Sequence, residues 1–274
     1  MSGNITVTPG YTFTSNTDPL TLTKLNQLTT PTAQVNAGAI TSRELASSTL
    51  LVDPATQAVL YDDFLGDTSA NSLIGNTAMT TLASGTGGAV AITASTAGRA
   101  GTVLFTGPSN AGYSMIRGTA SKGAWIGGNG TISWEWAIKT PATVADVTNN
   151  YELCIGLANG AADATQPTDG FYFYYNYATS AGVWVGRTAL GSTVTAVVST
   201  TTMAVSTWYT LKATMNALDT SIEFFINGVS IGTSTTNLPV AALTPICGLK
   251  WLAGASRTFN ADWCKVMETF TSSR

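Results

Sequence analysis

Apolar and polar residues alternate along several short stretches in the second part of the chain. In Gly130–Lys139 the apolar positions of this alternation are Ile132, Trp134, Trp136 and Ile138. Trp208–Asn216 repeats the pattern, with Tyr209, Leu211, Ala213 and Met215 at the apolar positions. A period of two residues is the side-chain period of a β-strand that buries one face. Both stretches are therefore predicted to be strands with one face in a core.

A hairpin and further strands are predicted around them. Asn227-Gly228 stands between two apolar runs of Ser221–Thr233, and this pair suits a two-residue turn in which both residues need a positive φ. Further predicted strands are Thr102–Phe105, Tyr113–Arg117, Tyr151–Ala158, Gly170–Tyr177, Val183–Arg187, Val194–Ser199, Ile246–Leu252 and Asn260–Phe270. Short strands separated by Gly and Asn turns, with no long amphipathic helix between them, are typical of a sandwich or barrel. The predicted fold is an all-β antiparallel jelly-roll sandwich.

The first 60 residues follow a different pattern. Two extended pieces, Ile5–Thr8 and Tyr11–Thr14, precede a predicted short helix over residues 20–28 that Pro31 helps to end, and a second helical turn is predicted over Ser42–Ser47. Such a segment cannot bury enough surface to be a domain alone. We therefore predict an N-terminal anchoring segment over residues 1–60 and a β-sandwich over residues 61–274.

Charge is scarce in this chain, and its scarcity narrows the function. Charged residues make up 10% of the 274 residues, against about 25% in a typical soluble protein. The net charge is −3 and no basic run occurs, which argues against nucleic-acid binding. No apolar stretch approaches the roughly 20 residues of a membrane span, and no export signal is recognisable. A surface with little charge and many apolar or hydroxyl side chains costs less to desolvate than a charged one, so a homotrimer is expected.

The candidate residues for metal binding are few. Cys154, Cys247 and Cys264 each lie in an apolar run, so we interpret them as small core residues. The chain has no histidine. Asp163 and Asp169 are interpreted as turn-forming residues, like Asp219. No metal and no cofactor are expected.

From Asp62 to its C-terminus the chain resembles the concanavalin A-like (lectin/glucanase) sandwich domains of bacteriophage virion proteins. The stretches that carry this resemblance are Tyr61–Phe64, Ile132–Trp136, Tyr151–Leu157, Asp169–Phe173, Trp208–Leu211, Phe224–Gly228 and Asp262-Trp263. In addition, Val7–Phe13 and Leu22–Leu28 resemble the lead segment of phage tail-fibre and head-fibre proteins. The resemblance implies two antiparallel sheets, one of them concave, and often a trimer in the virion. It implies no single activity.

Catalysis is not expected. Glycoside hydrolases of the wider fold need two carboxylates about 5 to 10 Å apart across the sugar cleft. The strand residues Glu135, Glu152, Glu223 and Glu268 each stand alone. Without histidine, a Ser-His-Asp triad or a Cys-His pair cannot form. The chain is therefore predicted not to be an enzyme.

One strand stands out for its consecutive aromatic residues. In Phe171–Tyr177 the residues Tyr172, Tyr174 and Asn176 lie on the face opposite Phe171, Phe173 and Tyr175. If the phenylalanines fill the core, we expect Tyr172 and Tyr174 on the outer or concave face, near Trp184. Such side chains suit a sugar platform, a subunit interface or packing within the domain. The candidate carbohydrate-binding residues are Tyr172, Tyr174, Asn176 and Trp184.

The predicted function is a phage virion structural protein: a head or tail fibre, or a capsid decoration subunit. It is expected to assemble in the host cytoplasm, to be released by lysis, and to join capsid or tail proteins through residues 1–60. Host-surface polysaccharide is a further candidate partner. The alternative is a dedicated carbohydrate-binding adhesin, and a polysaccharide-degrading enzyme is the least expected function.

Overall fold

The computed structural model of the 274-residue chain describes residues 6–8, 11–12, 32–34, 55–64, 73–75, 79–94, 98–99, 101–118, 125–159 and 166–272. The chain divides into two compact units, Met1–Asp53 and Pro54–Arg274. In the first unit, β1 (Thr6–Thr8) pairs with β2 (Tyr11–Thr12) and with β3 (Thr32–Gln34), both antiparallel. The two predicted extended pieces therefore contain strands. The predicted helix over residues 20–28 and the turn over Ser42–Ser47 lie outside the described residues.

The second unit consists of two antiparallel sheets, each with eight strands among the described residues. The first sheet runs in the order β17-β16-β15-β10-β19-β8-β7, and β4 also pairs with β19. Its strands are β4 (Gln57–Asp62), β7 (Ala89–Thr93), β8 (Thr102–Thr106), β10 (Gly130–Lys139), β15 (Trp208–Met215), β16 (Ile222–Ile226), β17 (Val229–Ser234) and β19 (Thr258–Phe270). Residues 60 and 61, where the two segments were expected to join, lie inside β4, so strand pairing places Gln57–Leu60 with the sandwich.

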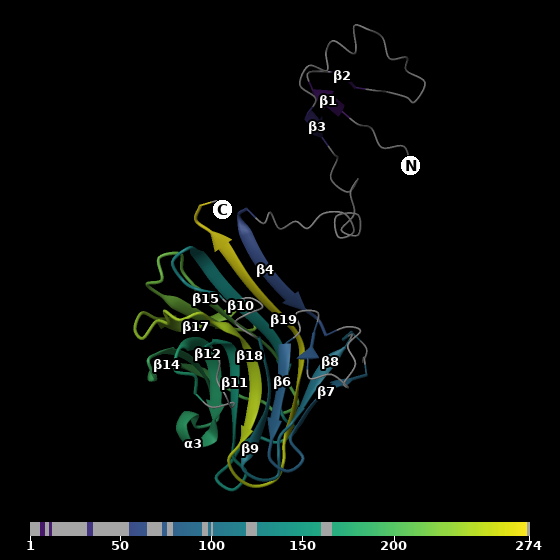
Figure 1. Cartoon of the computed structure of the whole chain (residues 1–274), viewed down its shortest axis with the longest axis vertical. Coiled ribbons are helices and arrows are strands. Elements are labelled where there is room, and N and C mark those ends of the chain that lie inside the picture. The colour runs from purple at the N-terminus through teal and green to yellow at the C-terminus, as the bar shows by residue number, and fades with distance from the viewer. Residues whose placement is uncertain are drawn as a thin grey trace. The chain divides into compact units, whose positions relative to one another are not determined.

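The second sheet runs in the order β14-β13-β12-β11-β18-β9-β6-β5. Its strands are β5 (Leu73–Ile74), β6 (Met79–Ser84), β9 (Gly112–Arg117), β11 (Tyr151–Ala158), β12 (Gly170–Asn176), β13 (Val183–Leu190), β14 (Thr193–Thr202) and β18 (Thr244–Trp251). Figure 1 shows this sheet as one layer, with β10 and β19 of the other sheet behind it. The predicted all-β jelly-roll sandwich is confirmed.

The core forms where the inner faces of the two sheets meet. Trp134 and Trp136 on β10 are buried, and the alternation of their strand places both indoles on the inner face. Trp134 packs edge-on against Phe173 of the opposite sheet, with ring centroids 6.0 Å apart. Its Nε1 donates a hydrogen bond of 3.0 Å to the carbonyl oxygen of Phe171, which also belongs to that sheet. The tryptophans therefore join the two layers through packing and through a buried polar contact.

The predicted hairpin is also present. Asn227 and Gly228 connect β16 to β17 with φ values of 51° and 79°, as a two-residue turn of this hand requires. Cys154, Cys247 and Cys264 are free and buried, as predicted for small core residues. No helix among the described residues has the length and apolarity needed to cross a membrane.

Candidate functional site

The aromatic strand β12 is buried on both faces. Phe171, Phe173 and Tyr175 belong to the core between the sheets, as expected. Tyr172 and Tyr174 point to the outer face of the second sheet, where they form a separate apolar cluster. The other buried members of this outer cluster are Met115, Cys154, Ala158, Ala189 and Ile246. Both tyrosines lie on the outer face, as expected, and with 0% and 1% exposure they follow one of the three alternatives, packing within the domain. Side chains of neighbouring strands cover them.

Trp184 lies on the other side of the sheet from these two tyrosines. Its indole is fully buried in the core, where it packs against Phe173, Tyr175 and Tyr209 at centroid distances of 5.7 to 6.2 Å. The register of β12 and β13 explains this placement. Val185 pairs with Tyr174 and shares its face, so the adjacent residue Trp184 faces the opposite way. The expectation that Trp184 lies with Tyr172 and Tyr174 is therefore wrong.

A hydrogen-bonded network connects the outer ends of β11 and β12. Glu152 Oε1 accepts from the hydroxyl of Tyr174 and from Nδ2 of Asn176, the latter at 2.9 Å. Asn176 Nδ2 also donates to the Tyr174 hydroxyl oxygen at 3.1 Å. Burial and, next, the hydrogen bond to Glu152 raise the pKa of Tyr174 to about 12. This tyrosine is thus a permanent donor at neutral pH, and it helps to hold the Glu152 carboxylate in place.

Asn176 also ends the strand and begins a short helix. Its Oδ1 accepts from the backbone N–H of Ala178 at 2.8 Å, the N-cap interaction of α3 (Tyr177–Ser180). Ala181 ends the helix in a left-handed conformation with φ of 49°. Tyr177 is the first residue of this helix and lies beyond the end of β12, and 37% of the residue is exposed. The sequence prediction extended the strand to Tyr177 and missed the helix, although Asn176, an N-cap residue four positions before Ser180, and Gly182 beyond the helix were available signals.

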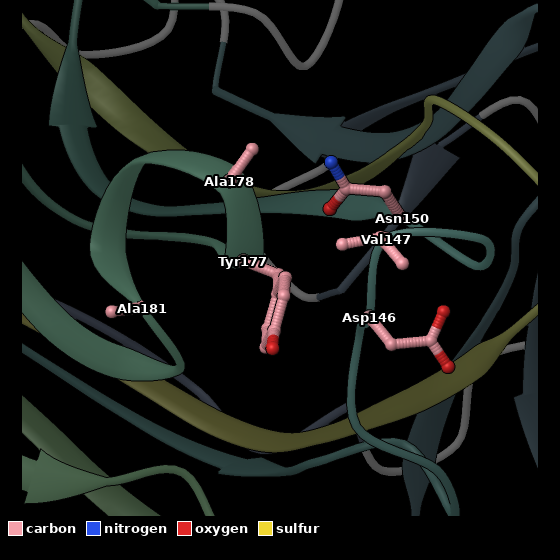
Figure 2. Close-up of a pocket in the computed structure, with 6 residues that line it drawn as sticks. All are labelled: Asp146, Val147, Asn150, Tyr177, Ala178 and Ala181. Carbon is pink, nitrogen blue, oxygen red and sulfur yellow. The ribbon is translucent and has the colours of Figure 1, made fainter.

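A hollow of about 420 Å³ lies between this helix and the loop that connects β10 to β11. Its lining residues are Asp146, Val147, Asn150, Tyr177, Ala178 and Ala181. Figure 2 shows the Tyr177 ring and the Val147 side chain beside the same space, with Asp146 next to Val147 and its carboxylate directed away from the Tyr177 ring. We call this hollow the α3 pocket. It combines one exposed aromatic ring with the polar groups of Asp146 and Asn150.

The polar side chains of the α3 pocket differ in their hydrogen-bond partners. Asp146 Oδ1 accepts from the backbone N–H groups of Asn149 and Thr148, at 2.6 and 2.7 Å. These hydrogen bonds lower the pKa of Asp146. Asn150 donates from Nδ2 to Asn176 Oδ1 at 3.5 Å, whereas its Oδ1 is buried and has no partner in the part of the chain that the structure describes. One acceptor of the Asn150 amide is therefore buried and unsatisfied by the described residues, in the wall of the α3 pocket.

The α3 pocket and the network beside it suit the recognition of a sugar. A pyranose ring presents an apolar face that stacks on tyrosine, and hydroxyl groups that donate to carboxylate and amide oxygens. On the described strands of the outer face, Glu152 is the one carboxylate, and it already accepts two hydrogen bonds. Among the described residues, no three Asp, Glu or Cys side chains gather as a metal-binding cluster.

The model of one protein family matches residues 98–261, which is more than half of the chain. That family is described as SO2946-like, C-terminal domain. The chain belongs to this SO2946-like family. The match spans the strands from the start of β8 into β19, and so includes both sides of the α3 pocket. No curated protein sequence matches the chain.

Solved structures show the same sandwich. The SO2946 protein of unknown function from Shewanella oneidensis MR-1 is 17% identical, with a TM-score of 0.59 over 88% of this chain and 99% of that one. An endo-1,3-beta-glucanase from Streptomyces sioyaensis is 13% identical, with a TM-score of 0.54 over 81% of this chain and 100% of that one. The carbohydrate recognition domain of Emp47p is 9% identical, with a TM-score of 0.50 over 80% of this chain and 99% of that one.

These similarities establish a concanavalin A-like lectin/glucanase fold for the SO2946-like chain. The expected fold family is thus confirmed. The neighbours include both a glucanase and a carbohydrate recognition domain, so the fold is compatible with an enzyme and with a binding protein. The choice between these functions rests on the site.

Proposed function

We propose that the chain is a non-catalytic glycan-binding protein whose sugar site is the α3 pocket. The observation that carries this proposal is the combination of the half-exposed Tyr177 ring with the unpartnered Oδ1 of Asn150 at one hollow. Stacking on the ring supplies apolar contact area, and a sugar hydroxyl satisfies the open acceptor. Tyr172, Tyr174 and Asn176 support the site from below, because Asn176 holds both Asn150 and the start of α3.

The absence of a catalytic role is part of the proposal. Hydrolysis of a glycosidic bond by the common mechanisms needs a second carboxylate within about 10 Å of the first. Among the described outer-face residues of the second sheet, only Glu152 is a carboxylate. Asp146 belongs to the pocket, but its carboxylate is ionised and holds the loop through two backbone N–H groups. A residue fixed in this role is poorly suited to donate a proton.

We further propose that this glycan-binding sandwich is a fibre or decoration subunit of a bacteriophage particle, located in the virion. The support is the resemblance of Val7–Phe13 and Leu22–Leu28 to the lead segments of phage fibre proteins, together with the low charge content of 10%. In this proposal residues 1–60 join the capsid or tail, the protein is a homotrimer, and the pocket contacts host-surface polysaccharide. Electron microscopy of particles labelled with an antibody against this chain tests the location.

Binding is tested by glycan-array screening of the full chain, followed by calorimetry with the best glycan. Tyr177→Ala is expected to weaken binding by about 1 to 3 kcal/mol, the usual cost of losing an aromatic anchor. The matched control is Tyr61→Ala, because Tyr61 is 53% exposed on β4 of the other sheet. Equal affinities of the two variants for the glycan would contradict the assignment of the pocket. A measurable release of reducing ends from the bound polysaccharide would contradict the non-catalytic role.

A further inference from the structure

Arg187 lies on the outer face of the second sheet, on the strand next to Tyr172. The register of β12 and β13 pairs Tyr172 with Arg187 and Tyr174 with Val185. The guanidinium carbon lies 3.5 Å from the centroid of the Tyr174 ring, so the cation is stacked on that aromatic face. Stacking of this kind orients the guanidinium and leaves its N–H donors directed along the sheet surface.

Two nitrogens of Arg187 lack hydrogen-bond partners among the described residues. Nε and Nη1 of Arg187 are buried and make no hydrogen bond in the described part of the chain. The hydroxyl of Tyr172, which is 0% exposed, lies beside this guanidinium: burial raises the pKa of Tyr172, and the charge of Arg187 and a hydrogen bond with it oppose that rise. Arg99, in contrast, forms an ion pair with Asp262 on the other sheet. Unmet donors of a buried cation are costly, and a carboxylate with two acceptor oxygens matches the fork of a guanidinium.

The surrounding charge favours an anion. The outer-face positions on the described strands of this sheet carry three cations, Arg117, Arg187 and Lys250, and one anion, Glu152. With three cations and one anion, these positions carry a net charge of +2, whereas the chain as a whole has a net charge of −3. Glu152 is already an acceptor for Tyr174 and Asn176. A face with this sign of potential attracts a negatively charged ligand.

The arginine is continuous with the α3 pocket. From the Tyr174 ring, which carries the guanidinium, the network runs through Asn176 to Asn150 in the pocket wall. Tyr177 follows directly after Asn176, the last residue of β12, so the pocket begins where the strand that carries the Tyr174 ring ends. An oligosaccharide with one sugar on Tyr177 can therefore extend over the end of β12 toward Arg187.

We infer that Arg187, with the hydroxyl of Tyr172, binds the carboxylate of an acidic sugar, so that the ligand of this protein is a uronate-containing polysaccharide. This inference rests on the proposed function, since it names the class of glycan that the α3 pocket and the outer face bind together. Arg187 binds the carboxylate of one sugar residue, and Tyr177 stacks on a neighbouring sugar residue.

The test uses an oligogalacturonate and its methyl ester, which carries no charge, in calorimetric titrations of the full chain. The wild-type protein is expected to bind the acid form about 10- to 100-fold more tightly than the ester, as expected for hydrogen bonds to charged groups. Arg187→Gln is expected to remove this preference, so that the acid form and the ester bind with equal affinity. Tyr172→Phe, which removes one oxygen, is expected to reduce the preference without abolishing it.

Lys265→Gln is the matched control, because it removes one positive charge from β19 on the other sheet. Thermal melting of each variant confirms that it is folded, and Arg187→Lys serves in place of Arg187→Gln if the latter does not fold. Loss of the preference only in the Arg187 variant supports the inference. Equal effects of Arg187→Gln and Lys265→Gln, which indicate general electrostatics, would overturn it. Equal binding of acid and ester, both lost in Tyr177→Ala, would overturn it while supporting the proposed function. Binding of neither form would count against the inference and against this ligand class.

Discussion

Replacement of Trp184 by alanine is expected to unfold the sandwich more readily and to leave the α3 pocket intact. The indole is 0% exposed and makes three aromatic contacts, with Phe173, Tyr175 and Tyr209. Removal of a buried tryptophan that cannot be refilled by its neighbours costs about 3 to 5 kcal/mol. Each aromatic contact beyond the buried area contributes about 0.5 to 1.5 kcal/mol to that total.

A second variant separates volume from the polar atom. Nε1 of Trp184 is buried without a hydrogen-bond partner in the described residues, so its loss removes an unsatisfied donor. Trp184→Phe retains an aromatic ring and loses that donor, and it is therefore expected to cost less than Trp184→Ala. Because part of the stabilisation by the indole is offset by this donor, about 1 to 2 kcal/mol is expected for the phenylalanine variant.

The assay is urea unfolding followed by tryptophan fluorescence, with the melting temperature measured in parallel. For the sandwich unit Pro54–Arg274, a loss of 3 to 5 kcal/mol corresponds to a decrease of roughly 6 to 20 °C. Tyr177→Ala is the control and is expected to change the free energy of unfolding by about 0.5 kcal/mol or less, since its ring is on the surface. A loss below about 1 kcal/mol for Trp184→Ala, or a larger loss for Tyr177→Ala, would refute the assignment of Trp184 to the core.

Three other outcomes are expected. Deletion of residues 1–55 is expected to leave a folded sandwich that no longer joins the particle, because the boundary between the two compact units falls between Asp53 and Pro54. An unfolded product in circular dichroism would contradict this prediction. Light scattering of the full chain at micromolar concentration gives the mass of a trimer, and a monomer mass with residues 1–60 intact would contradict the proposed assembly. Acid is expected to weaken the hydrogen bonds that hold the loop of the α3 pocket. Backbone hydrogen bonds lower the pKa of Asp146. The stabilisation that they give is therefore fully present above the ordinary pKa of a free aspartate and is lost as the pH falls through the lowered pKa. An NMR titration of the loop reports this pH dependence, and Asp146→Asn abolishes it.

The strands with one buried face were predictable from the sequence alone. Gly130–Lys139 and Tyr151–Ala158 were predicted at the bounds that the structure shows for β10 and β11. Their alternation or apolar run directly reflects burial, because successive side chains of a strand point to opposite faces. The Asn227-Gly228 turn was predictable for an equally local reason, since few residue pairs accept two positive φ values.

Strands with weak patterns were not predicted. β6 (Met79–Ser84) and β7 (Ala89–Thr93) consist mostly of Ala, Thr and Ser with few large apolar residues. Such residues fit a strand, a loop or a surface equally well, so pairing with β9 and β8 decides their conformation. The same holds for Gln57–Leu60, which β19 recruits into the first sheet.

The candidate site shows most clearly which features were predictable from the sequence and which depend on the tertiary structure. The sequence determined that Tyr172, Tyr174 and Asn176 share one face of a strand, because that depends on the backbone period alone. It did not determine what covers that face. Tyr172 and Tyr174 form a buried cluster with side chains of β9, β11, β13 and β18, and two of these strands, β9 and β18, are far from β12 in the chain. Likewise, the α3 pocket exists because pairing of β11 with β12 brings the loop around Asp146 next to Tyr177. No local sequence pattern encodes which segments meet in this way. The burial that defines the site is therefore a property of the tertiary structure.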